Sequence, residues 1–235
     1  MTLLRVLRQP FRDLMAGLEA MLAQGGGGAL ARVFAGLTVG WWLYVPVHEL
    51  LHAAGCWLGG GSVERLEISP LYGGAVLARW LAFVEPGGAY AGRLAGFDDG
   101  GSDAVYALTV FAPYVLTLFP GVWLLLRAGQ RRRAWLWGLA LPMALAPLLS
   151  VLGDAYELGS IVITQVPPWS APEIAAALRG DDLLLKLGSW AGGGPKLWLG
   201  GLLAALVGAA WAFATYGLGR ALARSARLGH RAPAD

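Results

Sequence analysis

Four stretches of the chain are long enough and apolar enough to cross a lipid bilayer as α-helices. A crossing helix needs about 20 mostly apolar residues, and the sequence supplies such runs at Val33 to Leu58, Ala104 to Leu126, Ala134 to about Val162, and Leu197 to Leu222. Only 14% of the residues are charged, whereas a soluble domain carries roughly 25%. We therefore expect an all-α polytopic membrane protein with about four transmembrane helices.

A further helix is expected before the first apolar stretch. Leucine and phenylalanine recur at helical spacing from Leu3 to Leu22, with three arginines among them, and the glycine run Gly25 to Gly28 follows. This pattern is typical of an amphipathic helix lying on the membrane surface. We therefore divide the chain into an interfacial helix, residues 1–28, and a membrane-embedded domain, residues 29–235. In the third apolar stretch, Pro142 and Pro147 are expected to kink the helix.

The distribution of charge predicts the orientation of the chain. With four crossings, the N-terminal segment, the loop after the second stretch and the C-terminal tail share one side of the membrane. All three are rich in arginine, and the opposite loops are acidic. Short cytoplasmic segments carry an excess of arginine and lysine, so we expect cytoplasmic termini in a bacterial inner membrane. The same rule explains the net charge of +3 without nucleic acid as a partner. The arginines are Arg5, Arg8, Arg12, Arg32, Arg127, Arg131, Arg132, Arg133, Arg220, Arg224, Arg227 and Arg231.

The two outer loops are expected to contain regular structure. Ser62 to Ser69 and Ala75 to Val84 are rich in aliphatic and aromatic residues, and Tyr72-Gly73-Gly74 between them is a turn signal. This arrangement predicts a β-hairpin in the first outer loop. In the second outer loop we expect a short helix from about Pro172 to Arg179, and another over Asp181 to Trp190.

The first apolar stretch contains the sequence His48-Glu49-Leu50-Leu51-His52. Residues four apart lie on one face of a helix, so both imidazoles can reach one tetrahedral Zn²⁺. Glu49 can contact a water at the metal and act as general base, while the metal lowers the pKa of that water. Ionisable groups inside a membrane helix are costly and are functional by default. The alternative is that these three side chains only bridge helices through hydrogen bonds.

A catalytic zinc usually takes a third protein ligand and leaves a fourth position open. The third apolar stretch supplies Asp154, at a depth matching His52 when both helices rise by about 1.5 Å per residue. Asp154 is therefore the expected third ligand. Glu157 lies one turn later and is the alternative, either as ligand or as a partner of a zinc-bound histidine. Asp154 could also serve only to cap a helix end.

From Trp41 to about Ser160, the chain resembles the site-2 protease family of intramembrane zinc metalloproteases. The order of its parts is similar: the His-Glu-Leu-Leu-His motif late in one helix, a strand-like segment, a second helix, and a third helix with Gly153-Asp154. The resemblance implies that His48, His52 and Asp154 bind zinc and that Glu49 is the catalytic base.

The chain also departs from the family pattern. In the family the third core helix carries an Asn-Pro-x-x-Asp-Gly motif, but this chain contains no asparagine, Ala155 follows Asp154, and the proline is displaced to Pro147. The family site usually opens toward the cytoplasm, whereas the arginines here place His52 nearer the outer face. The resemblance is therefore that of a distant member.

The sequence thus predicts hydrolysis of peptide bonds in membrane protein substrates, within or beside the bilayer. Two alternatives remain open. The first is a non-catalytic membrane subunit that binds a metal or a partner protein, and the second is a metal-dependent membrane hydrolase of a lipid or another non-peptide amide. The sequence does not define the substrate or the oligomeric state.

Overall fold

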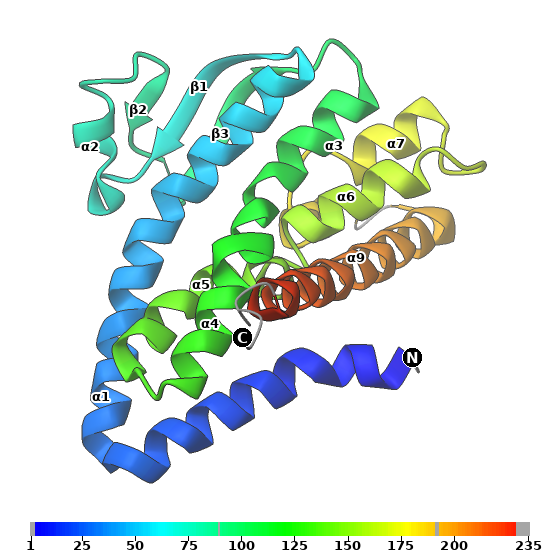
Figure 1. Cartoon of the computed structure of the whole chain (residues 1–235). Helices are drawn as coiled ribbons and strands as arrows, with labels where there is room; N and C mark the ends of the chain where they lie inside the picture. Colours follow the sequence, from blue (N-terminus) through cyan, green and yellow to red (C-terminus); the bar gives the residue numbers. More distant parts are fainter. Residues whose placement is uncertain (1–2, 89, 191–192, 229–235) are drawn as a thin grey trace. The chain divides into compact units, whose positions relative to one another are not determined.

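The computed structural model describes residues 3–88, 90–190 and 193–228 (Figure 1). Four helical segments in it are long and apolar enough to cross a membrane: Gly25–Gly59, Asp103–Gln130, Ala134–Ile163 and Pro195–Ser225. They coincide with the four stretches expected from the sequence, which confirms this part of the prediction. The C-terminal arginine at position 231, counted above for orientation, lies outside the described residues.

The first helix, α1 (Leu3–Gly59), is interrupted at Gly26, where φ is 47° and ψ is −131°. A positive φ strains a residue with a side chain, so the glycine run ends the N-terminal helix where the sequence predicted. Before this break, Pro10, Gly17 and Met21 form a buried face of the helix. Its opposite face exposes Leu4, Phe11, Met15 and Leu22.

The described chain forms two compact units. One unit contains the residues up to 45, residues 114–146 and the residues from 213 onward. Within it, Asp13 of α1 accepts hydrogen bonds from Arg220 Nε at 2.7 Å and from the Tyr216 hydroxyl at 3.1 Å. Both partners lie on the last helix, α9 (Pro195–Leu228). The other unit contains residues 46–113 and 147–212, including both motif histidines.

The second apolar segment is not one uniform helix. It begins with α3 (Asp103–Phe111), where the Ser102 side chain caps the first turn by accepting from the Val105 amide. A 3₁₀ turn, η2 (Ala112–Tyr114), and a π-helical turn, η3 (Thr117–Gly121), lead into α4 (Val122–Gln130).

The third apolar segment is broken rather than kinked. Helix α5 (Ala134–Leu149) ends two residues after Pro147, a turn occupies residues 150–153, and α6 (Asp154–Ile163) then begins. The expectation of one long helix was therefore wrong, and the break follows Pro142 and Pro147, which both lie inside α5. The break allows the chain to restart with Asp154 as the first residue of a new helix.

A small sheet follows α1, and its topology differs from the predicted hairpin. Strand β1 (Ser62–Ile68) was expected, but it pairs in parallel with β2 (Val84–Pro86) and antiparallel with β3 (Gly92–Asp98), in the order β2-β1-β3. The expected second strand, Ala75 to Val84, is instead mostly a helix and turns. The hairpin prediction was therefore wrong, although the first outer loop does contain β-structure.

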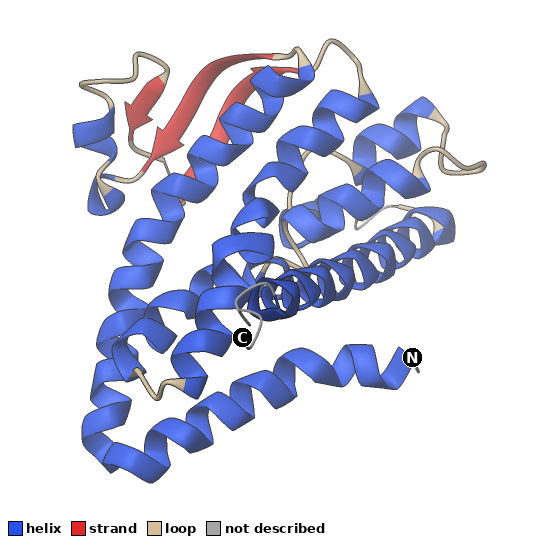
Figure 2. Ribbon diagram, viewed as in Figure 1, coloured by secondary structure: helices blue, strands red, loops and turns tan. Residues whose placement is uncertain are grey.

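The segment between β1 and β2 folds as η1 (Pro70–Tyr72) and α2 (Gly74–Leu77) because its apolar residues pack on one side. Leu77, Ala78 and Leu81 contact the buried cluster formed by Leu66, Ile68 and Val84. Residues spaced this way share a helical face, so helix and turns bury them better than a strand would. Figure 2 shows the strands beside the last turns of α1, where Leu50 packs against the same cluster.

The connection between the third and fourth apolar segments contains the two short helices that the sequence predicted, α7 (Pro172–Leu178) and α8 (Leu183–Ser189). They pack around a core of Tyr156, Leu178, Trp190 and Ala204. Helix α9 approaches α6 closely, since a Cβ at Gly208 would lie 2.1 Å from the carbonyl oxygen of Ala155. These contacts hold α6, and with it Asp154, within its unit.

Candidate metal centre

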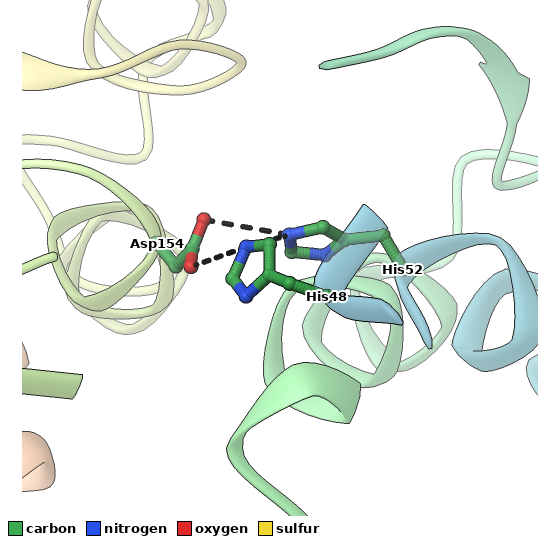
Figure 3. Close-up of side chains that lie close together, drawn as sticks. All are labelled: His48, His52 and Asp154. Atoms are coloured by element: carbon green, nitrogen blue, oxygen red, sulfur yellow. Dashed lines mark hydrogen bonds and ion pairs between the residues drawn. The ribbon is translucent and has the colours of Figure 1, made fainter. Parts of the chain in front are cut away.

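The two motif histidines lie one helical turn apart on α1 and point in the same direction (Figure 3). Their Nε2 atoms are 3.0 Å apart, and the imidazole rings are nearly perpendicular, with an interplanar angle of 88°. Both side chains are largely buried, with 12% exposed for His48 and 11% for His52. The i, i+4 spacing in the sequence therefore brings two nitrogen donors together, as expected.

Asp154 completes the group from α6. Its Oδ2 atom is 3.3 Å from His48 Nε2, and its Oδ1 atom is 3.6 Å from His52 Nε2 (Figure 3). One donor atom from each of the three residues can be chosen so that all lie within 4.8 Å of one another. The structure thus brings together His48, His52 and Asp154, the three residues expected from the sequence to hold a metal.

The spacing of these donor atoms fits a tetrahedral metal ion. Ligand bonds of about 2.0–2.2 Å at tetrahedral angles separate neighbouring donor atoms by about 3.3–3.6 Å. The separations from His48 Nε2 to Asp154 Oδ2, 3.3 Å, and from His52 Nε2 to Asp154 Oδ1, 3.6 Å, fall in this range, and the two Nε2 atoms are slightly closer, at 3.0 Å. Two imidazoles and one carboxylate are also a donor set that catalytic zinc sites use.

Asp154 has a second feature that suits a cation-binding residue. Its Oδ2 atom is buried and accepts no hydrogen bond within the described part of the chain. Leaving a buried acceptor unsatisfied is costly, and a cation held between this oxygen and the two imidazoles removes that cost. The residues present therefore fit a bound divalent cation, and the donor chemistry does not by itself identify the metal.

The His52 ring is oriented by a contact that the motif does not reveal. Its Nδ1 atom lies 2.8 Å from the backbone carbonyl oxygen of Thr109 on α3. A carbonyl only accepts, so Nδ1 carries the hydrogen and Nε2 presents its lone pair to the centre. The helices come close enough because residue 55 is glycine: a Cβ there would lie 2.6 Å from the carbonyl oxygen of Leu108. Thr109 acts through its backbone, so no side-chain signal marks it in the sequence.

Glu49 is buried beside the histidine pair, with 9% of the residue exposed. Strand β3 covers its side chain, and a Cβ built on Gly92 would lie 2.4 Å from Glu49 Cγ. The sheet that follows α1 therefore forms part of the surroundings of this carboxyl group, which sequence analysis did not anticipate.

Glu157, the alternative third ligand, is engaged elsewhere. Its Oε2 atom accepts a hydrogen bond from the Tyr106 hydroxyl at 2.8 Å, and the same hydroxyl accepts from the Gly180 amide at 3.0 Å. Glu157 is not among the residues whose donor atoms meet at the centre. Of the two acidic residues that the sequence offered, the structure brings Asp154 to the histidines.

Residues 179–183, after α7, contact the elements that hold the residues of the candidate metal centre. Arg179 forms an ion pair with Asp103 at the start of α3, and Asp181 pairs with Arg93 of β3 at 3.3 Å. The Leu183 amide donates to the carbonyl oxygen of Leu152, in the turn just before Asp154. This segment thereby fixes the break from which α6 starts.

Asp182 lies in the same segment, with its Oδ1 atom 2.9 Å from the position of a Cβ on Gly153. Partial burial of this carboxyl, together with the nearby charges of Asp154 and Asp181, raises the pKa of Asp182 above its ordinary value. Negative charge thus accumulates next to the centre, which favours a cation there.

Comparison with known proteins adds no assignment, because no protein-family model, no curated protein and no solved structure matches this chain.

Proposed function

We propose that this chain is an intramembrane zinc metalloprotease that hydrolyses peptide bonds of membrane protein substrates within or beside the bilayer. The observation that supports the proposal is the meeting of His48, His52 and Asp154 at separations of 3.0–3.6 Å, together with a buried Asp154 oxygen that accepts no hydrogen bond from the described residues. The resemblance of the motif and of Gly153-Asp154 to the site-2 protease family supports the same conclusion.

In this proposal each residue of the centre has a distinct role. His48, His52 and Asp154 would hold the metal. When bound, zinc polarises the scissile carbonyl and lowers the pKa of a water molecule. Glu49, next to His48 and shielded from solvent, takes the proton from the attacking water and delivers it to the leaving amine. Thr109 keeps the His52 ring in the orientation that this arrangement requires.

The proposed setting is a bacterial inner membrane with both termini in the cytoplasm. The support for the membrane is the four apolar helices of crossing length, and the support for the orientation is the arginine distribution. A helical substrate hides its carbonyl groups, so a segment must unwind before hydrolysis. The edge strands β2 and β3 offer backbone groups on which such an extended segment can be held by strand addition.

Replacement of the base tests the proposal. Glu49→Gln keeps the size of the side chain but removes its basicity, so we expect hydrolysis of peptides with an apolar segment to fall by about 10²–10⁴-fold. A peptide library carrying a fluorophore and a quencher provides the assay in detergent. Zinc content and thermal midpoint should stay at the wild-type level, because Glu49 is not a ligand.

Metal analysis of purified protein, prepared without chelator, supplies the second arm of the test. Wild type should contain about one zinc per chain, and His48→Ala should lose it. Wild-type protein without stoichiometric metal contradicts the proposal. If zinc is present but Glu49→Gln hydrolyses peptides as fast as wild type, the centre is structural, as in a non-catalytic subunit.

A further inference from the structure

Strand β3 meets Glu49 at a single backbone position. Of the heavy atoms that a Cβ on Gly92 would approach, the three nearest all belong to Glu49: Cγ at 2.4 Å, Cδ at 2.9 Å and Oε1 at 3.1 Å. A Cβ essentially never approaches another heavy atom within 3.0 Å. Position 92 is therefore restricted to glycine by the glutamate side chain lying against it.

The backbone of β3 does not itself require glycine there. Gly92 is not among the glycines with positive φ, and it pairs with Ile68 as an ordinary member of the antiparallel ladder. A residue with a side chain could adopt this conformation. The requirement for glycine therefore comes from the contact with Glu49 and not from the local chain geometry.

Neither partner of this contact can easily move away. Glu49 is carried by α1 in the turn that also carries His48 and His52, whose positions are fixed by the centre. On the other side, β3 is held by its pairing with β1, and the Ser69 amide donates to the Ala91 carbonyl oxygen at 3.0 Å immediately before Gly92. The atoms in closest contact are Cγ and Cδ, in the middle of the glutamate side chain, so rotation of its end does not relieve the overlap.

We infer that Gly92 is a positioning residue, whose bare backbone sets the direction of the Glu49 carboxyl group toward the metal centre. The effect of Gly92 on catalysis rests on the proposed function, in which Glu49 is the base. The contact between Gly92 and Glu49 does not depend on that proposal. In this arrangement the sheet following α1 determines where the proton acceptor lies, while the two histidines and Asp154 determine where the metal lies.

A double-mutant cycle on stability tests the contact without any assay of activity. We expect Gly92→Ala to lower the thermal midpoint by about 3–8 °C in the wild-type background. In the Glu49→Ala background the same change should cost little, because the atoms that it would overlap are gone. In the Glu49→Gln background the full cost should return, since Gln has the same bulk without the charge.

Gly96→Ala is the matched control on the same strand. A Cβ there would come no closer than 3.3 Å to Arg65 and does not approach Glu49, so its effect should be small and equal in all three backgrounds. If Gly92→Ala lowers the thermal midpoint equally in the wild-type and Glu49→Ala backgrounds, the inference is wrong.

The functional consequence is read from kinetics and metal content together. Gly92→Ala should retain stoichiometric zinc and an unchanged KM, while kcat falls by about 10–100-fold through displacement of the base. If Gly92→Ala keeps the wild-type kcat although the double-mutant cycle shows that positions 92 and 49 are coupled, Gly92 is not a positioning residue. Failure of the proposed function is recognised separately, because Glu49→Gln would then leave activity unchanged while the stability cycle still reports the contact.

Discussion

The hydroxyl group of Tyr106 donates a hydrogen bond to Glu157 Oε2 over 2.8 Å and thereby engages the acidic residue that was the alternative to Asp154 as third metal ligand. Both carboxylates lie in the first turn of α6, so their positions along the helix alone do not decide between them. The partners of each carboxylate distinguish the two residues, because Asp154 faces the two imidazoles and Glu157 faces α3.

Removal of each carboxylate should therefore have unequal effects on metal binding. In the proposed metalloprotease, Asp154→Ala would leave the metal with two protein ligands, so we expect loss of stoichiometric zinc and of all proteolysis. Glu157→Ala should weaken zinc retention by at most about 10-fold, the size of effect expected for a residue outside the ligand set. Equilibrium dialysis against a zinc buffer measures both variants.

Tyr106→Phe is the matched control for this pair, because it removes only the hydroxyl that holds Glu157 and should leave zinc bound. The reverse order of effects, with Glu157→Ala the more severe, would make Glu157 the ligand. If neither substitution alters metal content, the ligand set proposed above is wrong.

The charge of Asp182 should reduce stability in a pH-dependent manner. Its pKa is raised in the folded chain, mainly by partial burial and then by Asp154 and Asp181. A raised carboxyl pKa means that folding disfavours the ionised form. The ionised carboxyl therefore lowers the stability of the folded chain at neutral pH, and this loss of stability disappears as the pH falls below about 4. Asp182→Asn should therefore raise the thermal midpoint at pH 7, by only about 1–2 °C, because the carboxyl is no more than partly buried on a residue that is exposed as a whole, and solvent screens its charge.

The gain from Asp182→Asn should shrink as the pH is lowered, which a series of thermal scans from pH 7 to pH 4 measures. Asp99→Asn, at an acidic residue of the first outer loop, provides a comparison for general charge effects. A gain that stays constant over this range would contradict the assignment of the effect to the Asp182 carboxyl.

The N-terminal helix should owe much of its attachment to one ion pair. Asp13 and Arg220 lie 2.7 Å apart with side chains 9% and 17% exposed, and Tyr216 and Gln9 add hydrogen bonds to the same carboxylate. Removing one partner of such a pair leaves the other largely desolvated. We expect Asp13→Ala to lower the thermal midpoint by about 5–10 °C.

Limited proteolysis of the N-terminal helix should accelerate in the same variant. Arg224→Ala, which removes an exposed cation one turn further along α9, should change neither property. An Asp13→Ala protein as stable and as resistant as wild type would show that apolar packing alone holds the helix.

The proposed orientation in the membrane, which rests on the distribution of arginines, can be tested at the turn before α3. A reporter active only outside the cytoplasm, fused at the exposed Gly100, should be active, while a fusion at the C-terminus should not be. The opposite result would reverse the topology and restore the orientation usual in the site-2 protease family. Cys56 is fully buried, so a thiol reagent should label it only after unfolding, whichever side is exposed to the reagent.

The sequence predicted the parts of the centre that depend on helical spacing. His48 and His52 meet because residues four apart share a face, and Asp154 lies with them on a separate helix as its depth indicated. The third segment is broken directly before Asp154, yet this residue still lies beside both histidines.

The errors arose where packing partners distant in sequence decide the structure. Ala75 to Val84 has the composition of a strand, but its leucines pack as one helical face on the Leu66 cluster. Strand β3 was missed because Gly92 and Gly96 weaken the strand signal, and one of these glycines is present because of Glu49. The roles of Thr109 and Tyr106 depend on the close approach of α1, α3 and α6, which no local pattern encodes.

The turn at residues 150–153 has a consequence for how the chain tolerates changes in length. In an unbroken helix each residue advances the direction of the next by about 100°, so one inserted residue in α5 would rotate Asp154 away from the histidines. Because α6 starts anew after this turn, and the Leu183 amide holds the turn at Leu152, the angle of Asp154 is set locally. We therefore expect a one-residue change in the length of α5 to disturb the direction of Asp154 less than it would in an unbroken helix.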